Sequence, residues 1–413
     1  MSIRKLGFVA AAAALIVTLS ALALPLGAED VPGVTPTQIL LGGTHPYSGP
    51  AAAYAPIGKG ALAYFAYVND NGGVNGRKIV YEDKDDGYNP AQTLQIVRQF
   101  VEQDHVFAIF DSLGTPPNIA IRQYLNDNHV PQLFVATGAT TFGSDYKKYP
   151  YTIGWQASYH DESTIFGKYL LQTRPNAKVG VLYQNDDYGQ DLLSGLTASL
   201  GSKFGTTSSM IVKTASYEVT DPDVTAQIAS LKSSGVDTVF IFATPKFAIQ
   251  ALVTISKLSW KPLVFLNSVS ASQTIMRIAT KAGGPEATNG VVSAVYVKDP
   301  SDPLWTKDPG MKLYQKIMAK YLPGADASDV NYLYGMGVAY SMVDVLRKAG
   351  RNLTRNDLMQ AVTHMHESPN PFVLPGIIVS TTPTVRFPIR EEELMRYDAG
   401  SWNPFGGLIS SRY

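Results

Sequence analysis

The chain has 413 residues, with 34 basic and 34 acidic side chains, so its formal net charge is zero. This balance argues against nucleic acid or a polybasic membrane contact as the partner. The sequence contains no cysteine, which excludes disulfides, cysteine–zinc sites and thiol nucleophiles.

The first 28 residues have the pattern of a secretory signal peptide. Arg4 and Lys5 precede an almost uninterrupted apolar run from Phe8 to Leu24, and small residues follow up to Ala28. This order predicts cleavage near Ala28 and export to the periplasm. An uncleaved membrane-anchoring helix is the alternative. The rest of the chain is too long for one compact core, so we expect two domains.

Apolar runs alternate with helical patterns from residue 37 to about residue 149. This alternation predicts a parallel sheet with helices on both faces. Asn89 and Pro90 support one of the helices, because they provide an N-cap and a proline at the first helical position. The expected strands are 37–44, 78–83, 106–110 and 132–135, and the expected helices are 51–69, 90–103 and 118–127.

A second α/β series follows, which we expect to end in a loop at 267–270. Its expected strands are 178–183, 208–215, 236–242 and 262–266, and its expected helices are 162–172, 190–200, 223–233 and 245–258. The remaining tail is less regular. There we expect helices at 311–321, 329–348 and 352–365, extended structure at 369–390 and a strand at 393–398.

Two successive units of this kind imply two lobes with a crevice between them. Six polar loops follow the carboxyl ends of expected strands, and open α/β sheets bind their ligands at that edge. We therefore expect these loops to surround a ligand site. The loops are 45–50, 111–118, 136–141, 184–190, 243–246 and 267–270.

The loop at 111–118, with the sequence DSLGTPPN, connects a buried strand to a helix. Gly114 allows a close approach of the backbone, Thr115 is a candidate N-cap, and Pro116 suits the first helical position. A helix N-terminus presents free N–H groups to an anion. The loop therefore predicts a site for a small carboxylate, although an ordinary strand-to-helix turn explains it equally well on local grounds.

We find no arrangement of residues that indicates catalysis. The sequence contains no nucleophile elbow, no phosphate-binding loop of the Walker type and no dinucleotide fingerprint. Asp111, Asp186 and Asp187 are the candidate bases near the expected cleft. Histidine spacing does not indicate a metal site. We therefore expect a binding protein rather than an enzyme, with no cofactor and no metal.

The loops together resemble the Leu/Ile/Val-binding protein family of type I periplasmic binding proteins. The resemblance is carried by segments 46–50, 71–77, 114–116, 136–139 and 184–189 and extends to Leu394–Asp398. It implies two Rossmann-like lobes, a three-segment hinge, and a ligand in the cleft between the lobes. The implied N-terminal lobe is 31–154 plus about 295–385, and the implied C-terminal lobe is 155–294 plus about 386–413.

The resemblance also implies which residues contact the ligand. Tyr54 matches an aromatic residue of the side-chain pocket, and Tyr188 matches a tyrosine that closes over the ligand from the second lobe. The residues that match the carboxylate-binding loops are Gly114, Thr115, Gly138 and Thr140. Thr244 stands where amino-acid binders often have a tyrosine.

Ser268 departs from the family pattern, because amino-acid binders have an acidic residue there that pairs with the ligand ammonium. Segment 267–272 contains no Asp or Glu, and a buried ammonium without an anionic partner is costly. We therefore expect either an amino acid or, preferably, an aromatic or aliphatic acid without an amine.

The resemblance implies a monomeric receptor that delivers a small carboxylate-bearing solute to the membrane permease of an ABC importer. The alternative is a ligand-sensing periplasmic component of a signalling system, which would need an additional partner surface.

Overall fold

The computed structural model describes residues 31–200, 210–367 and 369–410. The expected signal peptide lies outside these described residues. Within them, no helix is both long enough and apolar enough to cross a bilayer.

The first sheet is parallel, and its described strands are arranged in the order β2-β1-β3-β4-β5. β1 lies beside both β2 and β3, so three strand ends meet near the loop at 111–118. The short last strand, β5, was not expected from the sequence. The bounds are β1 Gln38–His45, β2 Lys78–Asp85, β3 Ala108–Phe110, β4 Gln132–Val135 and β5 Thr152–Gly154.

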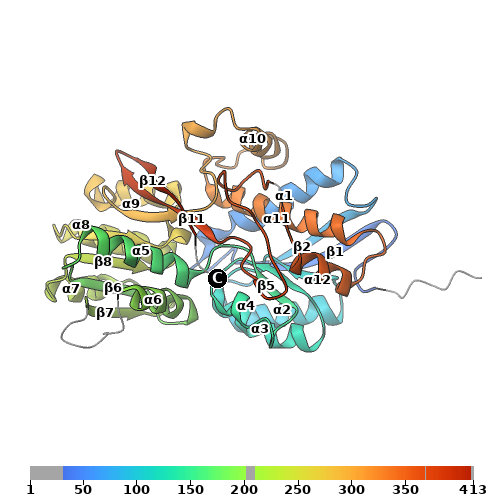
Figure 1. The fold of residues 1–413 in the computed structure, drawn as a ribbon, viewed down its shortest axis with the longest axis horizontal. Coiled ribbons are helices and arrows are strands. Elements are labelled where there is room, and N and C mark those ends of the chain that lie inside the picture. Colours follow the sequence, from blue (N-terminus) through green and yellow to red (C-terminus); the bar gives the residue numbers. More distant parts are fainter. Residues whose placement is uncertain (1–30, 201–209, 368, 411–413) are drawn as a thin grey trace, which may run out of the picture. The chain divides into compact units, whose positions relative to one another are not determined.

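The helices of this unit come from both ends of the chain (Figure 1). Asn89 caps α2 as expected, because its side chain accepts from the N–H groups of Ala91 and Gln92. The bounds of the early helices are α1 Pro56–Asp70, α2 Pro90–Glu102, α3 Thr115–Asp127 and α4 Thr141–Ser144. The late helices are α10 Pro309–Tyr321, α11 Val330–Ala349 and α12 Arg355–Thr363.

The helices α1 and α11 cross closely, although they are far apart in the sequence (Figure 1). The contact depends on a glycine in each helix. A Cβ atom at Gly335 would lie 2.0 Å from the carbonyl oxygen of Ile57, and one at Gly60 would lie 2.2 Å from that of Tyr332. Neither position has room for a larger residue. This crossing fixes the start of α11, which carries pocket residues, against the first sheet.

The second sheet has the order β12-β11-β10-β9-β8-β6-β7 over the described residues. The expectation that this series ends at 267–270 is wrong, because the chain continues through α9 into β10. β10 is parallel to β9, whereas β11 and β12 pair antiparallel at the edge. The bounds are β6 Val179–Gln184, β7 Ile211–Tyr217, β8 Thr238–Phe242, β9 Leu263–Leu266, β10 Val292–Val295, β11 Glu391–Asp398 and β12 Ser401–Ser410.

The helices of the second unit pack on this sheet around buried aliphatic and aromatic side chains. Their bounds are α5 Tyr159–Thr173, α6 Asp187–Leu200, α7 Thr225–Ser233, α8 Pro245–Lys257 and α9 Gln273–Gly283. Short 3-10 turns occur at Ala52–Tyr54, Ser268–Ser270, Pro285–Ala287 and Pro303–Trp305. The segment before β11 has isolated bridges rather than a strand, such as those joining Val297 to Val373 and His366 to Ser380.

These elements confirm the expected pair of α/β lobes. Buried residues of the strands form continuous apolar clusters with the helices that cover them. The residue boundaries proposed above for the two lobes stay a prediction.

Candidate functional site

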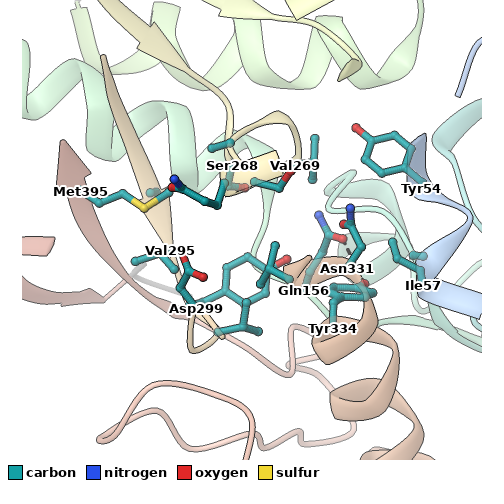
Figure 2. A pocket seen from close by; sticks show the side chains of 18 of the residues that line it. Tyr54, Ile57, Gln156, Ser268, Val269, Val295, Asp299, Asn331, Tyr334 and Met395 are labelled. Atoms are coloured by element: carbon teal, nitrogen blue, oxygen red, sulfur yellow. Dashed lines mark hydrogen bonds between the residues drawn. The ribbon is translucent and has the colours of Figure 1, made fainter. Parts of the chain in front are cut away.

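A large pocket lies where strand-end loops of the two sheets meet. Its empty volume is about 1200 Å³, a value that includes space open to solvent. Figure 2 shows Tyr54, Ile57 and Asn331 on one side of it, and Val295, Asp299 and Met395 on the other. Loops that follow β1, β3, β4, β6, β8 and β9 each contribute lining residues, namely Tyr54, Gly114, Thr115, Ala136, Tyr188, Thr244 and Ser268.

Six of the eight residues that the sequence suggested for ligand contact line this pocket. They are Tyr54, Gly114, Thr115, Tyr188, Thr244 and Ser268. The structure does not bring Gly138 and Thr140 into the lining. The Thr140 amide and hydroxyl both donate to the carboxylate of Asp191, and each donor–acceptor distance is 2.9 Å. The Gly138 carbonyl accepts from the Tyr159 N–H, so both residues form hydrogen bonds within the protein.

The loop at 111–118 offers fewer donors than its sequence suggested. The helix starts at Thr115, so Pro116 and Pro117 occupy its second and third positions and provide no N–H. The Gly114 N–H donates to Ala136, and the Asn118 N–H donates to Gly114. An anion here could therefore reach the amide and hydroxyl of Thr115, rather than a row of amides.

Gly114 has a positive φ of 101°, which favours glycine. The close approach at this position is made by another side chain of the pocket, because a Cβ atom on Gly114 would lie 2.4 Å from the ring of Tyr88. The Thr115 hydroxyl is 2.6 Å from the Thr137 hydroxyl. The Thr115 proton is free for a ligand when Thr137 is the donor of this pair, since each hydroxyl has one proton and two lone pairs.

Eight of the lining residues are tyrosine or tryptophan: Tyr54, Tyr88, Tyr159, Tyr188, Tyr296, Trp305, Tyr334 and Trp402. The rings of Tyr159 and Tyr188 meet edge to face, with centroids 5.2 Å apart. Burial raises the pKa of the Tyr188 hydroxyl well above its ordinary value, so this group is a neutral hydrogen-bond donor. Such a surface suits an apolar or aromatic ligand that carries few polar groups.

The charged side chains in the lining are both acidic. They are Asp299 and Asp302, and the described lining has no lysine, arginine or histidine. Burial raises the pKa of Asp299, and hydrogen bonds from Ser301 partly oppose the shift. A carboxylate in this pocket would therefore have to be held by dipoles, at the Thr115 end.

A carboxyl group does lie beside Ser268, contrary to the expectation from segment 267–272. It belongs to Glu162 of α5, which accepts hydrogen bonds from the amide and the hydroxyl of Ser268. Burial raises the pKa of Glu162 to about 7, although these hydrogen bonds lower it. Glu162 lies behind the pocket surface, and Ser268 itself forms the lining. The sequence argument for an amine-free ligand assumed that no acidic group lies near Ser268, and this assumption is wrong.

A charged cluster lies behind the loop at 111–118. His45 Nδ1 is 2.9 Å from Asp83 Oδ1, and His45 Nε2 is 3.6 Å from Asp111 Oδ2, with all three side chains buried. Burial lowers the pKa of His45, but the two carboxylates outweigh this and raise it to about 10. Burial raises the pKa of Asp111 to about 6. The cluster joins the ends of β1, β2 and β3.

None of the three candidate bases lines the pocket. Asp111 is engaged with His45, and Asp186 accepts from the amides of Tyr188 and Gly189 at the start of α6. Asp187 is the first residue of α6. The described residues also include no group of three or more histidine and acidic side chains that could hold a metal ion.

Further lining residues come from parts of the chain that the sequence had not linked to the site. They are Ala294 to Val297 around β10, Asn331 and Tyr334 of α11, Gln273 of α9, and Met395, Trp402 and Pro404 of the C-terminal hairpin. Their contribution depends on how distant elements pack, so no local pattern marks them.

Comparison with known proteins assigns this architecture to a family. The model of the periplasmic binding protein family matches residues 38–398, and the chain belongs to this family. Leu/Ile/Val-binding protein homolog 1 of Brucella abortus (strain 2308) is 30% identical over 207 residues. That match covers 49% of this chain and 53% of the relative, so the chain spans about half the length of this curated relative.

Solved structures show the same fold. A branched chain amino acid ABC transporter protein from Thermus thermophilus, solved with bound valine, has a TM-score of 0.79 at 19% identity, covering 92% of this chain and 98% of that one. A fatty acid ABC transporter substrate-binding protein from Thermomonospora curvata has a TM-score of 0.76 at 22% identity, covering 94% and 96%. The family model and the similarity to Leu/Ile/Val-binding homologues bear out the resemblance stated above, and the solved structures show the shared fold.

Proposed function

We propose that the chain is the extracytoplasmic receptor of an ABC importer and that it binds one small organic solute by closing two lobes around it. Membership of the periplasmic binding protein family supports the receptor role. The names of the Thermus and Thermomonospora proteins support a partnership with importer subunits. None of the three bases that the sequence suggested, Asp111, Asp186 and Asp187, lines the pocket, which supports binding without catalysis.

We further propose that the ligand is an aromatic or aliphatic acid without an amine. The observation that carries this proposal is a lining with eight aromatic side chains, which suits an apolar or aromatic ligand body. An apolar body gains about 25 cal/mol for each Å² that it buries. The carboxylate end would meet the Thr115 amide and hydroxyl at the lining formed by the loop at 111–118.

A thermal-shift screen of the mature protein tests both proposals. The compounds are leucine, isoleucine, valine, octanoate, phenylpropanoate and the matching amines. A ligand that binds only the folded protein stabilises it by about 2.7 kcal/mol at a concentration of 100 times Kd. We expect the two acids to raise the melting temperature most.

The outcomes distinguish the two proposals. The largest shift with leucine, isoleucine or valine would reject the amine-free ligand and leave the receptor role intact. A bound compound that was recovered chemically changed would instead reject the receptor role in favour of an enzyme.

A further inference from the structure

The pocket extends beyond the strand-end loops to the C-terminal hairpin. Gln273 at the start of α9, together with Met395 of β11 and Trp402 of β12, forms part of its lining. In Figure 2, Met395 and Asp299 lie on the side of the pocket opposite Tyr54. The family resemblance assigned a ligand contact to none of these positions, and the proposed carboxylate end at Thr115 does not use them.

Two buried polar atoms in this region have no hydrogen-bond partner among the described residues. They are Gln273 Oε1 and Trp402 Nε1, on side chains that are 9% and 7% exposed. The side-chain nitrogen of Gln273 donates to the Gly400 carbonyl at a distance of 2.6 Å, which fixes the orientation of the amide. Its oxygen is therefore the free acceptor, while Trp402 Nε1–H is a free donor.

Both residues contact Tyr397, so the three side chains form one cluster. Gln273 Nε2 is 3.4 Å from the Tyr397 hydroxyl. The rings of Tyr397 and Trp402 meet edge to face with centroids 5.1 Å apart, and the two residues are directly opposite in the hairpin. The free acceptor and the free donor are thus positioned by the same packed aromatic pair.

The surroundings of this group determine which ligand chemistry it can accept. A second carboxylate is disfavoured by Asp299 and Asp302, which line the same pocket. A purely apolar end would leave both polar atoms buried and unpaired, which is costly. A neutral group that both donates and accepts, such as a hydroxyl or a carboxamide, matches the free acceptor and the free donor of this group.

We propose that Gln273 and Trp402 form a distal subsite that selects ligands with a hydroxyl or carboxamide at the end remote from the carboxylate. This inference rests on the proposed function, because it assigns a second polar group to the same ligand. It predicts a bifunctional ligand with an apolar middle, and Gln273 and Trp402 become specificity-determining residues.

Titration calorimetry with matched compounds tests the subsite. The pairs are octanoate and its ω-hydroxy derivative, and phenylpropanoate and its para-hydroxy derivative. In the wild-type protein we expect the hydroxylated member of at least one pair to have a Kd about tenfold lower. In Gln273→Met and in Trp402→Phe, which keep most of the side-chain volume, we expect the ratio to fall to about twofold.

A matched control uses a glutamine outside the pocket. Gln227 of α7 donates to the Ser216 carbonyl, and Gln227→Met should keep the tenfold ratio. Equal affinity for both members of each pair in the wild-type protein would overturn the subsite while leaving the proposed function standing. If no compound of either pair bound, the proposed ligand class and the subsite would both be rejected. If both variants kept the wild-type ratio of Kd values, Gln273 and Trp402 would not be the residues that cause the preference for the hydroxylated compound.

Discussion

Glu162 accepts hydrogen bonds from both the amide and the hydroxyl of Ser268, although 106 residues separate them. This contact connects the first turn of α5 to the loop after β9. Because Ser268 lines the pocket and Glu162 does not, the carboxyl group acts on the site by holding the serine. The contact also explains how a loop without an acidic residue can still lie beside a carboxyl group.

A double-mutant cycle at this contact should reveal a coupling of about 1 kcal/mol, because hydrogen bonds to charged groups contribute more than neutral ones. Ser268→Ala should destabilise the wild-type protein more than it destabilises Glu162→Gln. The measurement is urea unfolding at pH 8. As a control, Ser270 donates to the Ala243 carbonyl and not to Glu162, so Ser270→Ala should be additive with Glu162→Gln. Additivity at Ser268 would contradict the contact.

Glu392→Gln should stabilise the protein increasingly as the pH rises from 5 to 8. The Glu392 side chain is buried, and its two oxygens have no hydrogen-bond partner among the described residues. Burial, reinforced by Glu162, raises its pKa well above 4.5. The folded state therefore keeps a proton that the unfolded chain has released, and wild-type stability falls as the pH rises.

We expect Glu392→Gln to gain more than about 1 kcal/mol over the wild type between these two pH values. The check is chemical unfolding at each pH. Glu393→Gln serves as the control, since Glu393 is only half-buried. The prediction fails if the two variants show the same dependence on pH.

Thr115→Val should weaken the binding of an acid about tenfold, because it removes the hydroxyl of a residue that lines the pocket. Thr137→Val removes the same hydrogen bond, since the two hydroxyls are 2.6 Å apart, but Thr137 is not part of the lining. Both variants should therefore lose stability, whereas only Thr115→Val should lose affinity. Calorimetry with the best acid from the screen makes the comparison, and unchanged affinity in Thr115→Val would remove Thr115 from the site.

His45→Gln should destabilise the protein by about 3 kcal/mol at pH 7, because it leaves two carboxyl groups buried without their cation. Asp83→Asn in the same chain should recover part of this loss, since one of the two charges is then absent. Urea unfolding of the single and double variants provides the test. The pKa of His45 is raised to about 10, so its stabilising effect is complete below pH 6.5 and is lost as the pH rises through about 10. A double variant less stable than the single one would contradict this account.

Most elements with strong local patterns were predictable from the sequence. The strand at 132–135 was predicted with its observed bounds, and the capping of α2 by Asn89 follows from the Asn-Pro pair. Long buried strands and capped helices have signals that belong to their own residues, such as apolar runs and N-cap side chains. These elements form the part of the fold that supports the strand-end loops.

The elements that were missed depend on distant partners. β10 pairs with β9 and with β11, and β11 follows about a hundred residues later. β12 contains proline and two glycines, which disfavour strands locally, and it is a strand because it pairs with β11. The helix α9, which connects β9 to β10, was missed along with them.

The site was only partly predictable for the same reason. The loops after the strands could be located, because parallel strands bring their carboxyl ends to one edge. The hydrogen bonds that those loops form could not be predicted. Thr140 is engaged by Asp191 from a helix of the second unit, and Ser268 is engaged by Glu162. Which donors remain for a ligand is therefore decided by tertiary contacts.

The irregular pairing of β11 with β12 has a consequence for how copies of the chain meet one another. The register shifts at Glu393, where the partner strand carries Gly406 and Gly407 in left-handed conformations. Pro404 in the same strand has no N–H. The outer edge of the seven-stranded sheet is therefore interrupted, and it offers a poor template for adding a strand from a neighbouring molecule. This edge should protect the protein against edge-to-edge aggregation at high concentration.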